Sequence, residues 1–383
     1  MFSTHRRILA GLVGALAGAT CLTGAASAAP WTKHATVNPL TGSGDWNSFS
    51  AVTRPAGNDS WAGGYMINYP NPNRDQILLE HWNGATWKVQ ATPATTGPDS
   101  QIVGMASTAR NDVWAVGTTG DFIGGSTTQP FAMHWNGSSW ALVPTPSFSN
   151  AALLAVAARS PADAWAAGQN DSGGLLEHWN GSSWSASAGA PGAGGLNGVA
   201  FVPHGTVWAV GTASDPNTGA ATTFAEHRVN GHWVRTPTPS PLDTDADDVN
   251  ELNSVTALSP TNAWAVGTVG NEDTGVPYRS FILHWNGVKW RRVPAQSPDP
   301  GGDPLFAVLA RGAHDVWAVG YGVEVGPKSR AIVQHWNGTK WAESAIHEGF
   351  LGSLAMNPAD GQLWAAGYTD TNTHVNTLLE AHS

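Results

Sequence analysis

A short motif ending in Trp-Ala-x-Gly occurs seven times in this chain, and it limits the possible folds more than any other feature. A second motif, His-Trp-Asn-Gly-x-x-Trp, follows each of the first six copies. Its fourth copy is degenerate, with Arg228 at the position of the first tryptophan. Copies of either motif are spaced by 43 to 57 residues. Self-similarity at such a period is typical of repeat folds. We number the repeats one to seven by their motif tryptophans: Trp61, Trp114, Trp165, Trp208, Trp264, Trp317 and Trp364.

Each repeat predicts four β-strands. An alternating aliphatic segment such as 252–258 precedes the Trp-Ala-x-Gly strand, and a third strand such as 281–285 follows it. Asn-Gly is a strong hairpin signal because both of its residues accept a positive φ, and here it leads into an outer strand such as 289–294. A proline then stops the pairing. Four antiparallel strands in about 50 residues form the sheet unit of a propeller blade.

The two ends of the chain indicate how the repeats close. The seventh repeat ends after its third strand, whereas residues 30–39 have the pattern of an outer strand and of nothing else in a repeat. We therefore expect an all-β, seven-bladed β-propeller over residues 29–383, closed by an N-terminal outer strand. A helical bundle is disfavoured, because 45 glycines, 25 prolines and only 12% charged residues cannot fill helix surfaces.

The repeat units resemble those of a known group of proteins. Asp112-Val113-Trp114-Ala115-Val116-Gly117 and the His-Trp-Asn-Gly-x-x-Trp units are similar to the repeats of exported bacterial β-propeller proteins. More distantly, they resemble kelch/galactose-oxidase-like and Asp-box propellers. The resemblance covers residues 30–383 and implies the architecture. It implies no activity, because such folds host many unrelated functions.

The N-terminus predicts an export signal. Arg6 and Arg7 precede the apolar stretch 8–22, and a small-residue site predicts cleavage after Ala28. We expect residues 1–28 to be a signal peptide and the mature protein to be secreted, with no membrane span. The arginine pair leaves general secretory and twin-arginine export both open. A lipoprotein anchor at Cys21 is disfavoured, since no aliphatic residue stands in the usual place before it. Cys21 is the only cysteine, so the mature chain has no disulfide or thiol chemistry.

Candidate binding residues lie where the repeats differ from one another. Connections between second and third strands, such as 65–77, 268–280, 321–330 and 368–377, vary in sequence and are expected on one face of the ring. Tyrosine and arginine are common at recognition surfaces. Since repeats five, six, seven and one are neighbours in a closed ring, we predict one aromatic, basic sector for ligand binding. It contains Tyr65, Tyr69, Arg74, Tyr278, Arg279, Tyr321, Lys328, Arg330 and Tyr368.

Two other groups are interpreted as structural. The recurrent histidines of the second motif would be spread around a ring and cannot converge, so each is expected to make a hydrogen bond within its own blade. The acidic run 243–248 has the alternation of a calcium loop, but Asp248 and Ser254 stand where an EF-hand needs Gly and Glu. A solvated loop is therefore favoured over a calcium site. We predict no metal and no cofactor.

The sequence narrows the function to a small set of classes. A net charge of −10 without a basic stripe disfavours nucleic-acid binding. Galactose-oxidase chemistry needs a cysteine that the mature chain lacks, and no nucleophile elbow, phosphate loop or zinc motif is present. We expect a monomeric, secreted, non-catalytic binding module for a glycan or cell-surface polymer. A polysaccharide lyase or glycoside hydrolase using the same sector, and an extracellular protein-interaction scaffold, remain the alternatives.

Overall fold

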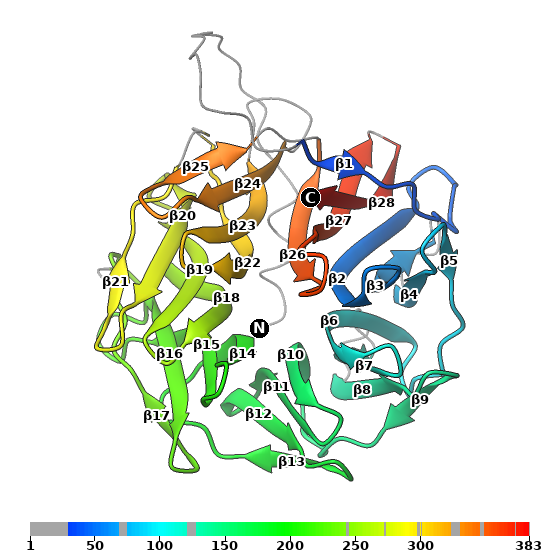
Figure 1. Ribbon diagram of the computed structural model, residues 1–383. Coiled ribbons are helices and arrows are strands. Elements are labelled where there is room, and N and C mark those ends of the chain that lie inside the picture. Colours follow the sequence, from blue (N-terminus) through cyan, green and yellow to red (C-terminus); the bar gives the residue numbers. More distant parts are fainter. Residues whose placement is uncertain are drawn as a thin grey trace, which may run out of the picture.

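The computed structural model describes residues 30–68, 75–120, 128–242, 245–271, 273–296, 299, 301–322, 330–344, 348–371 and 373–382. These residues form 28 β-strands and no helix (Figure 1), which confirms the all-β prediction. Within them there is accordingly no apolar helix of a length that could cross a bilayer. The predicted signal segment, with Cys21 and the cleavage site after Ala28, lies outside the described residues.

The strands follow the repeats in groups of four. Those of the N-terminal segment and of repeats one to three are β1 (Thr32–Lys33), β2 (Trp46–Ala56), β3 (Asp59–Ile67), β4 (Asp75–Trp82), β5 (Trp87–Val89), β6 (Asp99–Ala109), β7 (Asp112–Gly120), β8 (Gln129–Trp135), β9 (Trp140–Val143), β10 (Ala152–Ser160), β11 (Asp163–Asn170), β12 (Gly173–Trp179) and β13 (Trp184–Ser187). Those of repeats four to seven are β14 (Gly195–Phe201), β15 (Val207–Ser214), β16 (Ala221–Val229), β17 (His232–Arg235), β18 (Val249–Ser259), β19 (Asn262–Asn271), β20 (Val276–Trp285), β21 (Trp290–Arg292), β22 (Leu305–Gly312), β23 (Asp315–Gly322), β24 (Arg330–Trp336), β25 (Trp341–Ser344), β26 (Phe350–Met356), β27 (Leu363–Thr371) and β28 (His374–His382).

Repeats two to six each form one four-stranded antiparallel sheet, with the strands in chain order. The strands of repeats one and seven share an eight-stranded sheet, in which Trp46 of β2 pairs with Val375 of β28 in parallel. The N-terminal strand β1 pairs antiparallel with β28, with Thr32 opposite Ala381. Segments from the two ends of the chain thus lie in one sheet.

The sheets are arranged radially around a common centre (Figure 1). The first strand of each repeat contacts the first strand of the next, and β26 contacts β2. Because neighbouring strands within a sheet are antiparallel, turns between first and second strands and between third and fourth strands lie on one face, which we call the turn face. Turns between second and third strands and the linkers between repeats lie on the other, the linker face.

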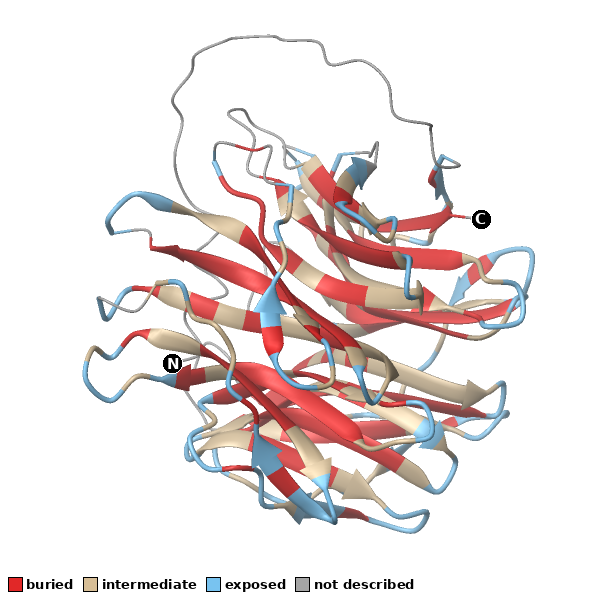
Figure 2. Ribbon diagram, turned by 60° about the vertical axis from the view of Figure 1, so that its left-hand side comes forward, coloured by how far each residue is buried: buried red, intermediate tan, exposed pale blue. Residues whose placement is uncertain are grey.

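The core lies between adjacent sheets. All seven motif tryptophans are at most 2% exposed, and each packs among side chains of the neighbouring repeat. Figure 2 shows buried residues along the middles of the strands and exposed ones at the turns. Burying a tryptophan in such a core is worth about 3–5 kcal/mol relative to alanine. The repeats therefore hold one another by packing.

The glycine that ends each motif is required by close backbone packing. A Cβ on Gly117 would overlap the carbonyl oxygen of Gln101 in the first strand, and one on Gly267 would overlap that of Glu251. The first strand is irregular at this point, with a register shift between Ile102 and Gly104. Only a residue without a side chain allows the two strands to approach so closely.

The expected geometry of the Asn-Gly turns is wrong in five repeats. Only in repeat four do both residues, Asn230 and Gly231, have positive φ, within a two-residue loop between Val229 and His232. Elsewhere the loop has four residues, and only the glycine has positive φ. In repeat one, for example, the Asn83 side-chain oxygen accepts bonds from the N–H groups of Ala85 and Thr86. In these turns the asparagine side chain caps backbone N–H groups of its own loop, which explains why asparagine occurs there.

The second and third strands also extend further than expected. The segment 268–280, predicted as a connection, lies largely within β19 and β20, with Asn271 paired to Val276. Alternating Thr268-Val269 continues the strand pattern beyond the motif glycine. Tyr65, Tyr278, Tyr321 and Tyr368 therefore lie on strands rather than in loops.

Candidate functional site

Three of the predicted tyrosines occupy the same position in their repeats. Tyr65, Tyr321 and Tyr368 each directly follow the motif glycine, toward the linker-face end of the second strand. They belong to repeats one, six and seven, whose first strands are in contact with one another. The corresponding residues in the other repeats are polar: Thr118, Gln169, Thr212 and Thr268. The tyrosines thus form an arc on one side of the linker face.

Rings from the first strands complete this arc. Phe306 stacks on Tyr321 with centroids 5.9 Å apart, and Phe350 stacks on Tyr368 at 4.9 Å. Phe350 also contacts Phe306 at 5.0 Å and Tyr321 at 5.5 Å, which joins the two pairs. Trp46 lies 6.3 Å from Tyr368. We call Trp46, Tyr65, Phe306, Tyr321, Phe350 and Tyr368 the aromatic cluster; all six are partly exposed.

The tyrosine hydroxyls lie within electrostatic range of one another. Burial raises the pKa of Tyr368, and the neighbouring Tyr65, Tyr321 and Asp370 raise it further. The Tyr368 hydroxyl therefore stays neutral at physiological pH and can both donate and accept a hydrogen bond. The cluster offers apolar ring surface together with neutral polar groups, which suits an uncharged ligand.

Two of the predicted basic residues, Arg279 and Arg330, are described, and both have partners near these rings. Arg330 forms ion pairs with Glu343 and, at 2.8 Å, with Asp299, while Arg279 donates to the Asp299 carbonyl oxygen. Burial opposes the charge of Arg330, but hydrogen bonds and ion pairs with Glu343 and Asp299 raise its pKa overall. Both arginines therefore hold the linker at Asp299, and the charge of Arg330 is matched by two carboxylates.

The remaining predicted residues fall into two groups. Tyr278 lies on β20 of repeat five, where its carbonyl oxygen accepts a bond from the Asp303 N–H at 2.8 Å. It is on a third strand, unlike the tyrosines of the cluster. Tyr69, Arg74 and Lys328 lie outside the described residues. Among the described residues, the structure brings together Tyr65, Tyr321 and Tyr368 in one place and Arg279 and Arg330 in another.

The acidic run has a local structural role where it is described. Asp248 is 4% exposed, and its carboxylate accepts bonds from the Asn271 side chain at 2.7 Å and the Asp245 N–H at 3.0 Å. Repulsion from Asp273 raises the pKa of the exposed Asp247. Asp243 and Thr244 lie outside the described residues. Elsewhere, no cluster of His, Cys, Asp or Glu in the part of the chain that is described could hold a metal ion.

The recurrent histidines form the expected hydrogen bonds within their own repeats. His81, His134, His178 and His335 each bond through Nε2 to an aspartate oxygen at 2.7–2.9 Å, and His284 bonds to Asn262 at 3.0 Å. Each ring also lies 4.1–4.5 Å from a motif tryptophan. In repeats four and five the histidine bonds to Thr236 and Asn262 instead of a carboxylate, and burial lowers the pKa of His227 and His284. These contacts confirm the structural interpretation.

Four buried glutamates precede the histidine position or its equivalent: Glu80, Glu177, Glu226 and Glu380. The Glu80 carboxyl accepts a bond from the Val37 N–H at 3.1 Å, and Glu226 accepts one from Ala190 at 2.5 Å. Val37 and Ala190 each lie six residues after an outer-strand tryptophan. The residue at that spacing before repeat three is Pro146, which has no N–H. Both oxygens of Glu177 lack a hydrogen-bond partner among the described residues.

Burial raises the pKa of these carboxyls, to about 7 for Glu80, about 8 for Glu177 and about 7 for Glu226. Raised carboxyl pKa values are common at catalytic sites. These three side chains are fully buried between sheets of different repeats, so they cannot reach a substrate. They belong to the packing of the linkers.

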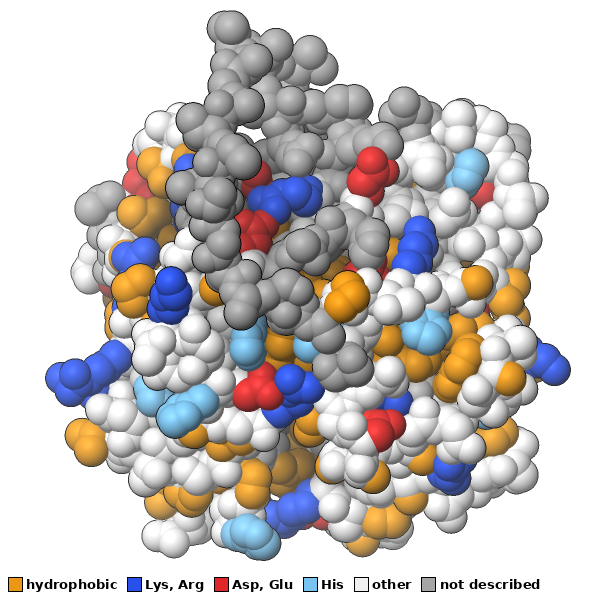
Figure 3. All heavy atoms as spheres, turned by 45° about the horizontal axis from the view of Figure 1, so that its top comes forward, with side chains coloured by type: hydrophobic (Ala, Val, Ile, Leu, Met, Phe, Trp, Pro, Cys, Tyr) orange, Lys and Arg blue, Asp and Glu red, His pale blue; other side chains and the backbone are white. Residues whose placement is uncertain are grey.

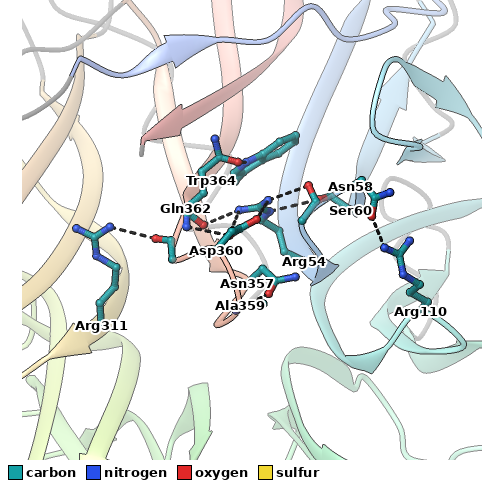
Figure 4. Close-up of polar contacts among 12 residues, drawn as sticks. Arg54, Asn58, Ser60, Arg110, Arg311, Asn357, Ala359, Asp360, Gln362 and Trp364 are labelled. Atoms are coloured by element: carbon teal, nitrogen blue, oxygen red, sulfur yellow. Dashed lines mark hydrogen bonds and ion pairs between the residues drawn. The ribbon is translucent and has the colours of Figure 1, made fainter.

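On the turn face, Arg54 links repeats one and seven (Figure 4). Its guanidinium lies 4.9 Å from the Trp364 ring centroid. It donates to the Gln362 carbonyl oxygen at 2.6 Å and to the Asp360 carboxylate at 3.1 Å. Burial lowers its pKa, and Asp360 opposes that shift. The same figure shows Arg110 and Arg311 reaching from other repeats to neighbouring turns, so arginines clamp several junctions.

We expect Arg54→Met to lower the free energy of unfolding by about 2–3 kcal/mol, because it removes a fully buried guanidinium that bonds to groups of two repeats. Urea denaturation followed by tryptophan fluorescence measures this. Arg110→Met is the matched control. The Arg110 side chain is 54% exposed, so less than about 1 kcal/mol should be lost. Equal losses in the two variants would show that the burial of Arg54 is unimportant.

Charged side chains are scattered over the face shown in Figure 3. Among the described residues visible on that face, basic and acidic side chains form no broad basic patch. A nucleic-acid backbone would need such a patch.

Comparisons with known proteins identify the fold. No protein-family model and no curated protein sequence matches the chain. Among solved structures, YCF48 bound to D1 peptide superposes with a TM-score of 0.56 and 15% identity, over 92% of this chain and 96% of that one. YCF48 from Cyanidioschyzon merolae gives 0.52 and 14%, over 93% and 99%. At this identity the likeness concerns the fold alone, and the chain is a β-propeller repeat protein.

Proposed function

We propose that this protein is a seven-bladed β-propeller, closed by the pairing of β1 with β28, that acts as an exported, non-catalytic binding module. Its ligand is a glycan or cell-surface polymer, held at the aromatic cluster. One observation carries the proposal. The single position after the motif glycine is tyrosine in three neighbouring repeats and polar in the other four, so one sector of an otherwise regular surface is built differently.

The chemistry of the cluster favours an uncharged polymer. Partly exposed rings provide flat apolar surface for sugar faces, and neutral tyrosine hydroxyls can bond to sugar hydroxyls. The nearby cations Arg279 and Arg330 are committed to Asp299 and Glu343. A lyase would need cations available to neutralise a uronate. The engagement of these arginines therefore supports binding of a neutral glycan over the lyase alternative.

Tyr321→Ala tests the site. We expect it to weaken retention on a bound insoluble polysaccharide by about tenfold, because it removes a central ring of the cluster. Residues 29–383 would be passed over neutral and acidic polysaccharides, and each sample assayed for retained protein and for new reducing or unsaturated ends. Tyr278→Ala is the control, with retention unchanged. New sugar ends would contradict the non-catalytic proposal, and equal retention of both variants would contradict the site.

Peptide recognition is the second candidate. It is favoured by the likeness to YCF48, whose solved structure contains a bound D1 peptide. The partly exposed aromatic cluster also has the composition of a protein-interaction surface. Retention of extracellular peptides that depends on Tyr321, with no retention on any polysaccharide, would favour this scaffold function over the glycan proposal.

A further inference from the structure

Five junctions between repeats share one contact on the turn-face side. The first tryptophan of each His-Trp-Asn-Gly-x-x-Trp motif lies against the motif tryptophan of the preceding repeat, with ring centroids 4.9 to 5.8 Å apart. In four cases the indole N–H donates to a carbonyl oxygen in the turn between first and second strands, namely in Trp135, Trp179, Trp285 and Trp336. This tryptophan pair is therefore a repeated packing contact between neighbouring repeats.

The junction of repeats three and four departs from this pattern. Arg228 takes the tryptophan's place, and its guanidinium carbon lies 5.0 Å from the centroid of the Trp165 ring. The Nε of Arg228 is buried and has no hydrogen-bond partner among the described residues. Arg54, by comparison, uses its Nε, Nη1 and Nη2 in hydrogen bonds. Nε is enclosed, so a group from outside the chain can reach only the two Nη atoms of Arg228. These make no hydrogen bond or ion pair with a described residue, so the guanidinium has hydrogen-bonding capacity that the described chain does not use.

Arg228 borders a hollow of about 550 Å³. The hollow lies between the turns of repeats three and four, and is therefore on the turn face, opposite the aromatic cluster. Its polar and aromatic walls include Arg159, Asp163, His178, Asn180, Phe201 and Arg228. The volume falls in the range of small-molecule sites and accommodates one or two sugar rings.

The charges around the hollow favour a monoanion. Arg159 pairs with Asp163, and its guanidinium carbon lies 4.8 Å from the Phe201 ring centroid. The same Asp163 carboxylate also bonds to His178 Nε2 at 2.9 Å. Arg159 and His178 thus share one carboxylate, and no carboxylate among the described residues pairs with the positive charge of Arg228. The planar edge of a guanidinium matches a carboxylate with two parallel hydrogen bonds.

We infer that this hollow is a second binding site, which takes a carboxylated sugar residue by pairing its carboxylate with Arg228. Asn180 uses its side-chain oxygen to cap the Ser182–Ser183 turn, so its amide nitrogen can donate to a sugar hydroxyl. The inference does not depend on the aromatic cluster, which lies on the other face. It adds a ligand of opposite character, acidic rather than neutral.

Isothermal titration of residues 29–383 with glucuronate, glucose and inorganic phosphate tests the inference. We expect binding of glucuronate and neither of the others. Arg228→Lys keeps the charge but loses the planar fork, and should weaken binding about tenfold or more. Arg228→Trp restores the contact found at five other junctions; this variant should fold at least as stably and bind no glucuronate.

The control is Arg291→Gln, which removes one exposed positive charge on β21 and should leave the affinity for glucuronate unchanged. Absence of glucuronate binding to the folded wild-type chain overturns the inference, as does binding that survives in Arg228→Trp. Equal binding of glucose or of phosphate also overturns it. Tyr321→Ala separates the two sites, because it should weaken polymer retention about tenfold without changing the affinity for glucuronate.

Discussion

Glu177→Met should stabilise the protein, by about 3–5 kcal/mol at pH 9. The fully buried Glu177 carboxyl has no hydrogen-bond partner among the described residues, and burial raises its pKa from 4.5 to about 8. A shift of about 3.5 units corresponds to about 4–5 kcal/mol. Methionine fits because Met133 and Leu283 hold the same strand position in repeats two and five, where Pro93 and Pro239 occupy the linker position of Pro146.

The stabilisation by Glu177→Met should increase with pH. Below about pH 4.5 the carboxyl is protonated in both folded and unfolded chains, so ionisation makes no difference to stability. Between pH 4.5 and about 8 the Glu177 carboxyl is ionised in the unfolded chain but neutral in the folded one. The wild type therefore loses stability with each pH unit across this range. The advantage of Glu177→Met should therefore grow across that window and level off above it. Urea denaturation at pH 5, 7 and 9 measures it.

Glu226→Met is the matched control at pH 5, where Glu226 is protonated in the folded chain because its pKa is raised to about 7. Its carboxyl accepts the Ala190 N–H, so methionine leaves a buried donor unbonded and should cost about 1–3 kcal/mol. Glu177→Met should cost nothing there. A Glu177→Met gain that is the same at every pH would show that ionisation is not its cause.

Trp31→Ala should lower the free energy of unfolding by about 3–5 kcal/mol, the usual cost of deleting a buried tryptophan. Trp31 is 4% exposed although it lies almost at the described N-terminus, and its ring contacts Trp317 at 5.7 Å and His382 at 5.2 Å. Thermal unfolding by circular dichroism measures the loss. Lys33→Ala changes an exposed residue of the same short strand and should leave the melting temperature unchanged.

This pair of variants also tests ring closure. If the pairing of β1 with β28 closes the propeller, Trp31→Ala should destabilise the whole domain in one transition, since every repeat depends on its neighbours. A small loss confined to local fraying of the N-terminus would contradict closure by this strand.

Much of the fold could be predicted because its causes repeat. The motif tryptophan recurs because each sheet packs on the next, and the motif glycine recurs because the second strand approaches the first closely. The same two requirements thus appear seven times in the sequence. The Asn-Gly turns were harder. A two-residue and a four-residue loop contain the same dipeptide, and only the pairing of the flanking tryptophans, such as Trp82 with Trp87, separates them.

The site was predicted in part for a similar reason. Tyr65, Tyr321 and Tyr368 share a register that the sequence displays, and their convergence follows from it. Trp46 belongs to neither repeat motif, and this is the sequence signal that could have indicated a separate role. Phe306 and Phe350 lie on first strands, where apolar residues are expected anyway. The contacts of Arg279 and Arg330 with Asp299 depend on how a linker folds back, which no local pattern encodes.

The pairing of β1 with β28 has a consequence in time. Thr32 and its partner Ala381 lie 349 residues apart in the sequence, so β1 stays unpaired until all the intervening strands have been made. At a rate of about 5–20 residues per second, that delay is roughly 20 to 70 seconds. A chain that lacks β28 never acquires the partner. It keeps an unpaired strand edge, which is a site for aggregation.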